Sequence, residues 1–286
     1  MSVSSSLIGF VWSRKAPGGA DEVVMAVARR MRRRGWMNAA RKSAQLETRP
    51  PVVRHLASRS SVAPVESARA YIFDVEGTLV DTVLPSLNCW CQTLVEFGFT
   101  FRTADLHRYS GMDGKEVLAR LLPQSAELKD FILSKYNWRF RTEVLPTVRA
   151  VPGARDLLAT LKRRGAKIAL ASNCHPDELV QYRACLGVDE FVDVYVSGDD
   201  VRRGKPHPDV ITTALKRLGG TQPSDAVFVG DTPYDAEAAR QARVRSFGVL
   251  SGHFPRADLV SAGCSAIFLD PKSMNQALAA PAPEAA

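Results

Sequence analysis

Short apolar runs alternate with helical patterns through most of the chain, and this alternation constrains its fold more than any other feature. It is typical of βαβ units, in which helices join parallel strands and cover the faces of a sheet. One helical pattern repeats apolar residues at i, i+3, i+4 and i+7: Ala154, Leu157, Leu158 and Leu161. Strands are predicted at residues 70–73, 167–171, 191–196, 226–229, 245–249 and 266–269. We therefore expect an α/β fold built on a parallel sheet.

The alternation breaks between residues 82 and 150, where no strand pattern appears. Helices are predicted there at 115–122 and 126–144, after a first helix with one apolar face: Leu87, Trp90, Cys91 and Leu94. Ligands of parallel sheets bind at the carboxyl ends of the strands, so helices inserted after the first strand would lie over the site as a lid. We therefore expect a core formed by 67–81 and 151–272 and a helical cap at 82–150.

Both ends of the chain lack a core pattern. Residues 1–66 hold 12 of the 38 basic and 4 of the 30 acidic residues, and they are predicted to form a disordered basic extension. Such an extension could be an organelle transit peptide, but we favour a dispensable tail. Residues 273–286 end in a low-complexity run of Ala and Pro and are predicted to form a flexible tail.

The overall charge of +8 does not indicate a nucleic-acid partner, because residues 67–286 hold the remaining 26 basic and 26 acidic residues. No apolar run approaches the ~20 residues that span a bilayer. The five cysteines are odd in number and irregularly spaced, which fits a reducing compartment better than a disulfide framework. We expect a cytoplasmic monomer or homodimer that binds neither nucleic acid nor membrane.

Polar residues follow four of the predicted strands. Asp74 ends the first in the string FDVEGTLVDT, and Ser172 and Asn173 follow the strand KIALA. Further along come Lys205 in RGKPHPD, and two carboxylates, Asp231 and Asp235, in VGDTPYDAEAA. Each motif lies at or beyond the carboxyl end of a strand, so all four should converge on one rim of the sheet.

This set of groups suits phosphoryl transfer. A carboxylate at a strand end can act as nucleophile or metal ligand, and a hydroxyl with nearby N–H groups can bind phosphate oxygens. A transferring phosphoryl group spreads negative charge over three oxygens, so its catalysis needs preorganised positive charge. Lys205 and a Mg²⁺ ion held by the carboxylates would supply that charge.

The motifs DVEGT, SN, GKPHPD and GDTPYD resemble, in this order, those of the haloacid dehalogenase (HAD) superfamily over roughly residues 70–270. The likeness is to its capped phosphatases, the phosphoglycolate phosphatase and β-phosphoglucomutase-like group. It implies a Rossmann-like core with an inserted helical cap. It also implies an aspartyl-phosphate intermediate formed on Asp74.

The resemblance further implies roles for single residues. Mg²⁺ would be held by the Asp74 carboxylate, the Glu76 backbone carbonyl and Asp231, with Asp235 behind them. Ser172, Asn173 and Thr78 would bind the phosphoryl group. Lys205 would neutralise its charge.

Glu76 departs from the commonest phosphatase form, in which the residue two positions after the nucleophile is Asp. That residue protonates the leaving oxygen and later deprotonates water, work typically worth ~10²–10⁴ in rate. A working acid/base, an impaired enzyme and different chemistry are three interpretations of the glutamate. We favour the first, because enolase-phosphatases show a similar D-x-E-G-T string.

The polar segment YSGMDGK, from Tyr109 to Lys115, has two interpretations. It could be a cap loop that reaches into the site, with Lys115 binding substrate. It could equally be a turn between helices, with Asp113 as the N-cap of the second helix.

The sequence thus predicts Mg²⁺-dependent hydrolysis of a small phosphorylated metabolite, a phosphomonoester. A sugar-phosphate mutase of the same fold is the first alternative, and it would release no inorganic phosphate. A catalytically silent phosphate-binding protein is the second, and it would bind phosphate without turnover.

Overall fold

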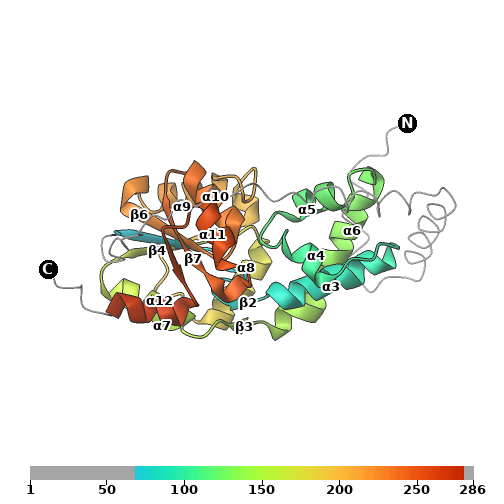
Figure 1. Cartoon of the computed structure of the whole chain (residues 1–286). Coiled ribbons are helices and arrows are strands. Elements are labelled where there is room, and N and C mark those ends of the chain that lie inside the picture. The colour runs from blue at the N-terminus through green and yellow to red at the C-terminus, as the bar shows by residue number, and fades with distance from the viewer. Residues whose placement is uncertain (1–67, 280–286) are drawn as a thin grey trace.

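The computed structural model describes residues 68–279, whose centre is a sheet of six parallel strands (Figure 1). The strand order is β5-β4-β1-β6-β7-β8. The bounds are Ala70–Phe73 for β1, Lys167–Ala171 for β4, Val194–Val196 for β5, Ala226–Gly230 for β6, Arg245–Val249 for β7 and Ala266–Phe268 for β8. The predicted α/β fold with a parallel sheet is confirmed.

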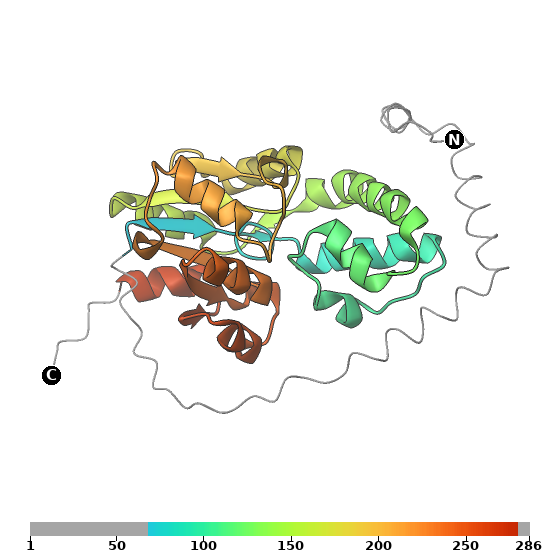
Figure 2. The ribbon, with the colours of Figure 1, turned by 90° about the horizontal axis from the view of Figure 1, so that it is seen from above.

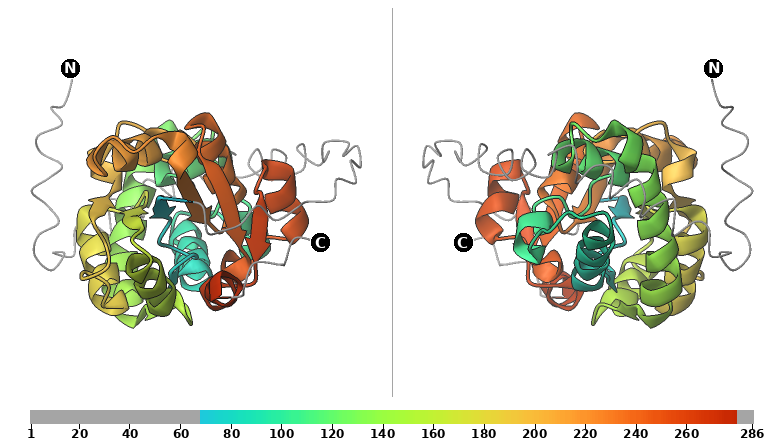
Figure 3. Two further views of the ribbon diagram at one scale, coloured as in Figure 1. Left: turned by 90° about the vertical axis from the view of Figure 1, so that its left-hand side faces the viewer. Right: turned by 90° about the vertical axis from the view of Figure 1, so that its right-hand side faces the viewer.

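Successive side chains of β1 point to opposite faces of the sheet, so each face receives its own apolar layer. Tyr71 and Phe73 belong to one buried cluster, and Ala70 and Ile72 to the other. The first cluster includes residues of α7 (Ala154–Arg163), α8 (Pro176–Leu186) and α12 (Pro271–Ala279). The second includes residues of α9 (Asp209–Arg217) and α10 (Pro233–Gln241), and α11 (Arg256–Ala262) packs against α10. Figure 3 shows helices on both sides of the sheet.

The strand order places the expected ligand position of such a sheet beside β1. The chain passes from β1 to β4 and β5 on one side, and then to β6, β7 and β8 on the other. In open parallel sheets, ligands bind outside the carboxyl ends of the strands where the order reverses in this way. The residues that follow β1 and β6 therefore face this crevice.

Four helices are inserted between β2 (Val80–Asp81) and β3 (Arg149–Ala150), which pair antiparallel. They are α3 (Val83–Glu96), α4 (Thr103–His107), α5 (Gly114–Leu121) and α6 (Ala126–Arg139), followed by a π-helical turn, η3 (Phe140–Val144), and a 3₁₀ turn, η4 (Leu145–Thr147). We call residues 83–147 the insertion. It has its own buried cluster, which includes Leu94, Leu118 and Ile132. Figure 2 shows its helices beyond the carboxyl end of β1.

The strand predicted at 191–196 is shorter in the structure and begins at Val194. The N–H of Phe191 donates to the Val188 carbonyl in a turn. The Asp193 carboxylate accepts a hydrogen bond from the Ile168 N–H at 2.8 Å. A side chain thus replaces the backbone carbonyl that would accept this bond in a regular strand pair. The apolar run alone did not reveal this polar interruption.

The flexible tail predicted from residue 273 starts too early. Residues 273–279 belong to α12, and Met274 and Leu278 are buried against the first cluster. They are spaced i, i+4 and so face the core together. The extension predicted at 1–66 and the last seven residues lie outside the described part of the chain. None of the helices within residues 68–279 is long and apolar enough to cross a membrane.

Candidate active site

The predicted motifs meet at one end of the sheet. Asp74 follows β1, Ser172 follows β4 and Asp231 follows β6, while Lys205 comes from the loop between β5 and α9. All four residues are buried, with at most 3% of their surface exposed. Parallel strands end at the same edge of a sheet, which is why residues about 160 positions apart in sequence come together here.

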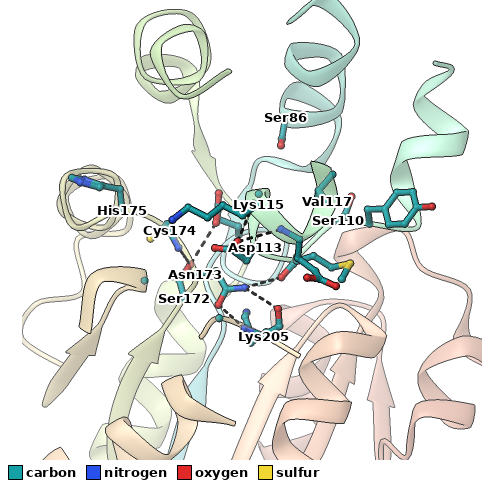
Figure 4. Close-up of a pocket in the computed structure, with 18 of the residues that line it drawn as sticks. Ser86, Ser110, Asp113, Lys115, Val117, Ser172, Asn173, Cys174, His175 and Lys205 are labelled. Atoms are coloured by element: carbon teal, nitrogen blue, oxygen red, sulfur yellow. Dashed lines mark hydrogen bonds between the residues drawn. The ribbon is translucent and has the colours of Figure 1, made fainter. Parts of the chain in front are cut away.

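A cavity of about 1150 Å³ lies between these loops and the insertion. The strand-end loops contribute Asp74, Glu76 and Ser172 to its lining, and the insertion contributes apolar side chains and Lys115. Figure 4 shows Lys115 on the wall opposite Ser172 and Lys205. A ligand in this cavity would contact both parts of the molecule at once.

Lys205 lies between two carboxylates. Its Nζ contacts Asp74 Oδ1 and is 2.8 Å from Asp235 Oδ1. Burial alone would lower the pKa of Lys205, but the charges of Asp235 and Asp74 outweigh it and raise the pKa. The lysine is therefore a fixed positive charge beside Asp74.

Three buried carboxylates, those of Asp74, Asp231 and Asp235, each offer an oxygen within 4.8 Å of the others. Burial raises the pKa of Asp74 and of Asp231, and the neighbouring carboxylates add to the increase. Lys205 neutralises only one of the three charges. Asp231 Oδ2 has no hydrogen-bond partner among the described residues. This surplus of negative charge and the unpartnered oxygen fit a hard divalent cation, which prefers oxygen ligands.

Asp235 is held from both sides. Its Oδ2 accepts from the Thr232 N–H at 3.0 Å and the Thr232 hydroxyl at 2.7 Å, in the capping box of α10. Its Oδ1 is the oxygen that contacts Lys205. Asp235 thus forms an ion pair with Lys205 behind Asp74. Its expected place behind the direct metal ligands stays a prediction, because it also belongs to the cluster of three carboxylates.

Thr78 was predicted to bind substrate, but its hydroxyl faces the carboxylates. Thr78 Oγ1 lies 3.1 Å from Asp74 Oδ2 and 2.8 Å from Asp231 Oδ1, and its one proton can serve either oxygen. The residue is fully buried and does not line the cavity. The Thr78 hydroxyl thus lies against two carboxylates, a position that the sequence string did not indicate, and its binding of substrate stays a prediction.

Glu76 points its carboxyl into the cavity. Tyr182 donates its hydroxyl to Oε1 at 2.9 Å, and Ser172 Oγ is 3.4 Å from Oε2. Burial, with the negative charges of Glu178 and Asp74, raises the pKa of Glu76 to about 7, against the opposing hydrogen bond from Tyr182. Such a carboxyl can both give and accept a proton near neutral pH.

Asn173 ties three segments together. Its Oδ1 accepts the Lys205 N–H at 2.8 Å, and its Nδ2 donates to the Gly111 carbonyl of the insertion at 3.1 Å.

Lys115 lies in the first turn of α5, where Asp113 Oδ1 accepts its N–H at 2.9 Å. Asp113 therefore caps α5, as one interpretation of the YSGMDGK segment expects. Lys115 lines the cavity, and its binding of substrate stays a prediction.

The sequence interpretation missed Tyr182 and Glu178, two α8 residues close to Glu76. Tyr182 is buried, and Glu178 pairs with Arg141 at 3.1 Å. They are spaced i, i+4, so they lie on one face of the helix. Only the i, i+4 spacing could have suggested this pair of residues. The spacing does not indicate that they lie close to Glu76, about 100 positions earlier in the sequence.

Comparison with known proteins identifies relatives among hydrolases and phosphatases. Residues 71–249 match the family model described as haloacid dehalogenase-like hydrolase. The phosphorylated carbohydrates phosphatase of Thermotoga maritima is 30% identical over 72% of this chain and 96% of its own length. The validoxylamine A 7′-phosphate phosphatase of Streptomyces hygroscopicus is 26% identical over 64% of this chain and 85% of its own. A hydrolase structure from Pseudomonas syringae is 28% identical, with a TM-score of 0.68, over 73% of this chain and 97% of that one.

Proposed function

The chain belongs to the haloacid dehalogenase-like hydrolases and is a phosphatase of that family, and from this premise we propose that it hydrolyses small phosphomonoesters with Mg²⁺ through a phosphorylated Asp74. One observation carries the proposal. A buried carboxylate held by Lys205 and a second carboxyl, that of Glu76, line the same cavity. Asp74 can act as the nucleophile and Glu76 as the acid/base toward the same bound ester.

The first half of the reaction transfers the phosphoryl group to the protein. A carboxylate oxygen of Asp74 attacks phosphorus, and the bond from phosphorus to the ester oxygen breaks. Glu76 gives its proton to that oxygen, so the alcohol leaves neutral. Ser172 and Lys205 bind the phosphoryl oxygens, and Lys205 balances their charge.

The second half restores the enzyme. Glu76, now ionised, takes a proton from water as the water oxygen attacks phosphorus. The bond to Asp74 breaks, and inorganic phosphate leaves. A Mg²⁺ ion held by the Asp74 carboxylate, the Glu76 carbonyl and Asp231 would supply positive charge that lets an anionic nucleophile meet an anionic phosphate.

The insertion acts in this proposal as a cap. Lys115 faces the phosphoryl site from the opposite wall, so it can bind the part of the substrate that departs. The two curated relatives are named for phosphorylated carbohydrates and for validoxylamine A 7′-phosphate. The phosphate of a phosphorylated carbohydrate is bonded to an alcohol oxygen, which supports an alkyl phosphate as the substrate class.

A phosphate-release assay on a panel of alkyl phosphates, with Mg²⁺ and with EDTA, tests the proposal. We expect turnover of at least one ester that requires the metal, and a phosphorylated Asp74 peptide after rapid acid quench. Isomerisation of a sugar phosphate without phosphate release would identify a mutase instead. Tight phosphate binding with no turnover on the whole panel would leave only the silent binding protein.

A further inference from the structure

We propose that Tyr182 is a positioning residue that holds Glu76 for proton transfer. The inference rests on the proposed function, because it assigns a partner to the acid/base of that reaction. Tyr182 does not line the cavity and would not touch substrate. It would act only through the Glu76 carboxyl.

The hydrogen bond itself is well fixed. Tyr182 is 0% exposed and belongs to the apolar cluster on one face of the sheet, so its ring cannot turn without disturbing that layer. Its hydroxyl is 2.9 Å from Glu76 Oε1. A side chain packed in this way gives the glutamate a rigid reference point.

The two oxygens of Glu76 then have different tasks. Oε1 accepts from Tyr182, whereas Oε2 lies 3.4 Å from the Ser172 hydroxyl, on the side of the phosphoryl site. The donor at Oε1 leaves Oε2 as the oxygen that carries the transferable proton. Tyr182 therefore decides which oxygen faces the leaving group.

This arrangement gives a physical reason for a glutamate at position 76. Glu has one more rotatable bond than Asp, and a free Glu side chain would spread over more conformations. The extra methylene also carries the carboxyl far enough to reach α8, where Tyr182 lies in the helix Pro176–Leu186. The added freedom is removed by the hydrogen bond, so the longer side chain stays aligned.

The first test replaces Tyr182 by Phe, which removes the hydroxyl and keeps the ring. We expect kcat/KM for an alkyl probe, glycerol 2-phosphate, to fall about ten- to a hundredfold through misalignment of the acid. For p-nitrophenyl phosphate, whose leaving group needs little protonation, the fall should be several times smaller. A role limited to stability would lower both values equally.

Tyr195→Phe is the matched control. Tyr195 also donates to a carboxylate, Asp189 Oδ1, at 2.6 Å, but it lies outside the cavity lining. This variant should keep the wild-type kcat/KM on both esters. Thermal unfolding of the Tyr182 and Tyr195 variants separates loss of fold from loss of alignment.

A second test compares the effect of Tyr182→Phe in wild type with its effect in the Glu76→Asp variant, so that a general loss of folding would lower both. In Glu76→Asp the shorter carboxyl no longer reaches Tyr182, so adding Tyr182→Phe should cost less than about twofold, whereas it costs tenfold or more in wild type. Equal losses in the two backgrounds, or no loss with glycerol 2-phosphate in wild type, would overturn the role of Tyr182 while leaving the phosphatase proposal intact. Absence of turnover by the wild-type chain on every ester would overturn both.

Discussion

At the scale of single residues, the site concentrates like charges that folding alone would not favour. Asp74, Asp231 and Asp235 are buried within 4.8 Å of one another, with Lys205 as their cation. Burial and mutual repulsion raise the pKa of Asp74 and Asp231, so the ionised forms destabilise the metal-free fold. Clusters of this kind are retained for chemistry and not for stability.

Asp74→Asn separates these two effects. An amide can neither attack phosphorus nor give a cation a full charge, so phosphate release should drop to background. Lys205 keeps Asp235 as its partner at 2.8 Å, and one repulsive charge is lost. In EDTA we therefore expect the melting temperature of Asp74→Asn to equal or exceed that of wild type. Substantial remaining turnover would remove Asp74 from the role of nucleophile.

Glu76 gives a second prediction at this scale. Glu76→Gln cannot donate or accept the proton, so kcat/KM should fall by about 10²-fold or more for glycerol 2-phosphate and less for p-nitrophenyl phosphate. Glu76→Asp should retain part of the activity, since its carboxyl survives at a shorter reach. Equal rates for wild type and Glu76→Gln on the alkyl ester, where chemistry limits turnover, would contradict an acid/base role.

At the scale of elements, the turn after β7 supports Asp231. This 3₁₀ turn, η7 (Leu250–Gly252), brings Gly252 so close that a Cβ there would lie 1.8 Å from Asp231 Oδ2. On its other side, His107 of α4 places Nε2 2.9 Å from the Gly252 carbonyl, and its ring packs 4.4 Å from that of Phe254. The turn is therefore held between the insertion and an expected metal ligand.

Gly252→Ala should displace either the turn or the Asp231 carboxylate. We expect a smaller rise in melting temperature on addition of Mg²⁺ than in wild type, because a ligand that binds the folded state stabilises it less when its affinity is lower. Ser251→Ala is the control, since it changes the same turn and the Ser251 hydroxyl has no hydrogen-bond partner among the described residues. Equal Mg²⁺ responses in the two variants would argue against Asp231 as a ligand.

At the scale of the whole molecule, the cavity lies between the insertion and the loops at the end of the sheet. The insertion packs around its own cluster, and its residues Cys89, Phe140 and Val144 also belong to one of the two clusters that cover the faces of the sheet. The parts are joined by the β2–β3 pair and by contacts such as that of Asn173 with the Gly111 carbonyl. Movement of the insertion relative to the sheet would therefore change the cavity and also shift these shared apolar contacts.

Removal of residues 1–66 should leave kcat and KM unchanged. The family match starts at residue 71, and every expected catalytic, substrate or metal residue lies at or after Asp74. Kinetics of the full-length and shortened proteins on the same ester provide the measurement. A large fall in kcat for a shortened protein that remains folded would show that the basic segment takes part in catalysis.

Sequence patterns were sufficient to predict the strand rhythm, the helical insertion and the placement of four polar motifs at strand ends. Apolar periodicity and parallel-sheet geometry are sufficient for this, because every parallel strand ends at the same edge. Asp74, Ser172, Lys205, Asp231 and the second carboxylate after β6 could be located in this way. Local polar detail was less accessible, as the late start of β5 and the burial of the Thr78 hydroxyl show.

The contacts of each polar group, in contrast, depend on the folded arrangement of the whole chain. Tyr182 and Glu76 are 106 positions apart, and their hydrogen bond depends on how α8 packs on the sheet, which no local pattern records. The same is true of Gly252, whose closeness to Asp231 follows from two loops meeting after β6 and β7. Periodicity fixes which face of an element is buried, whereas the pairing of atoms across elements depends on packing of the whole core.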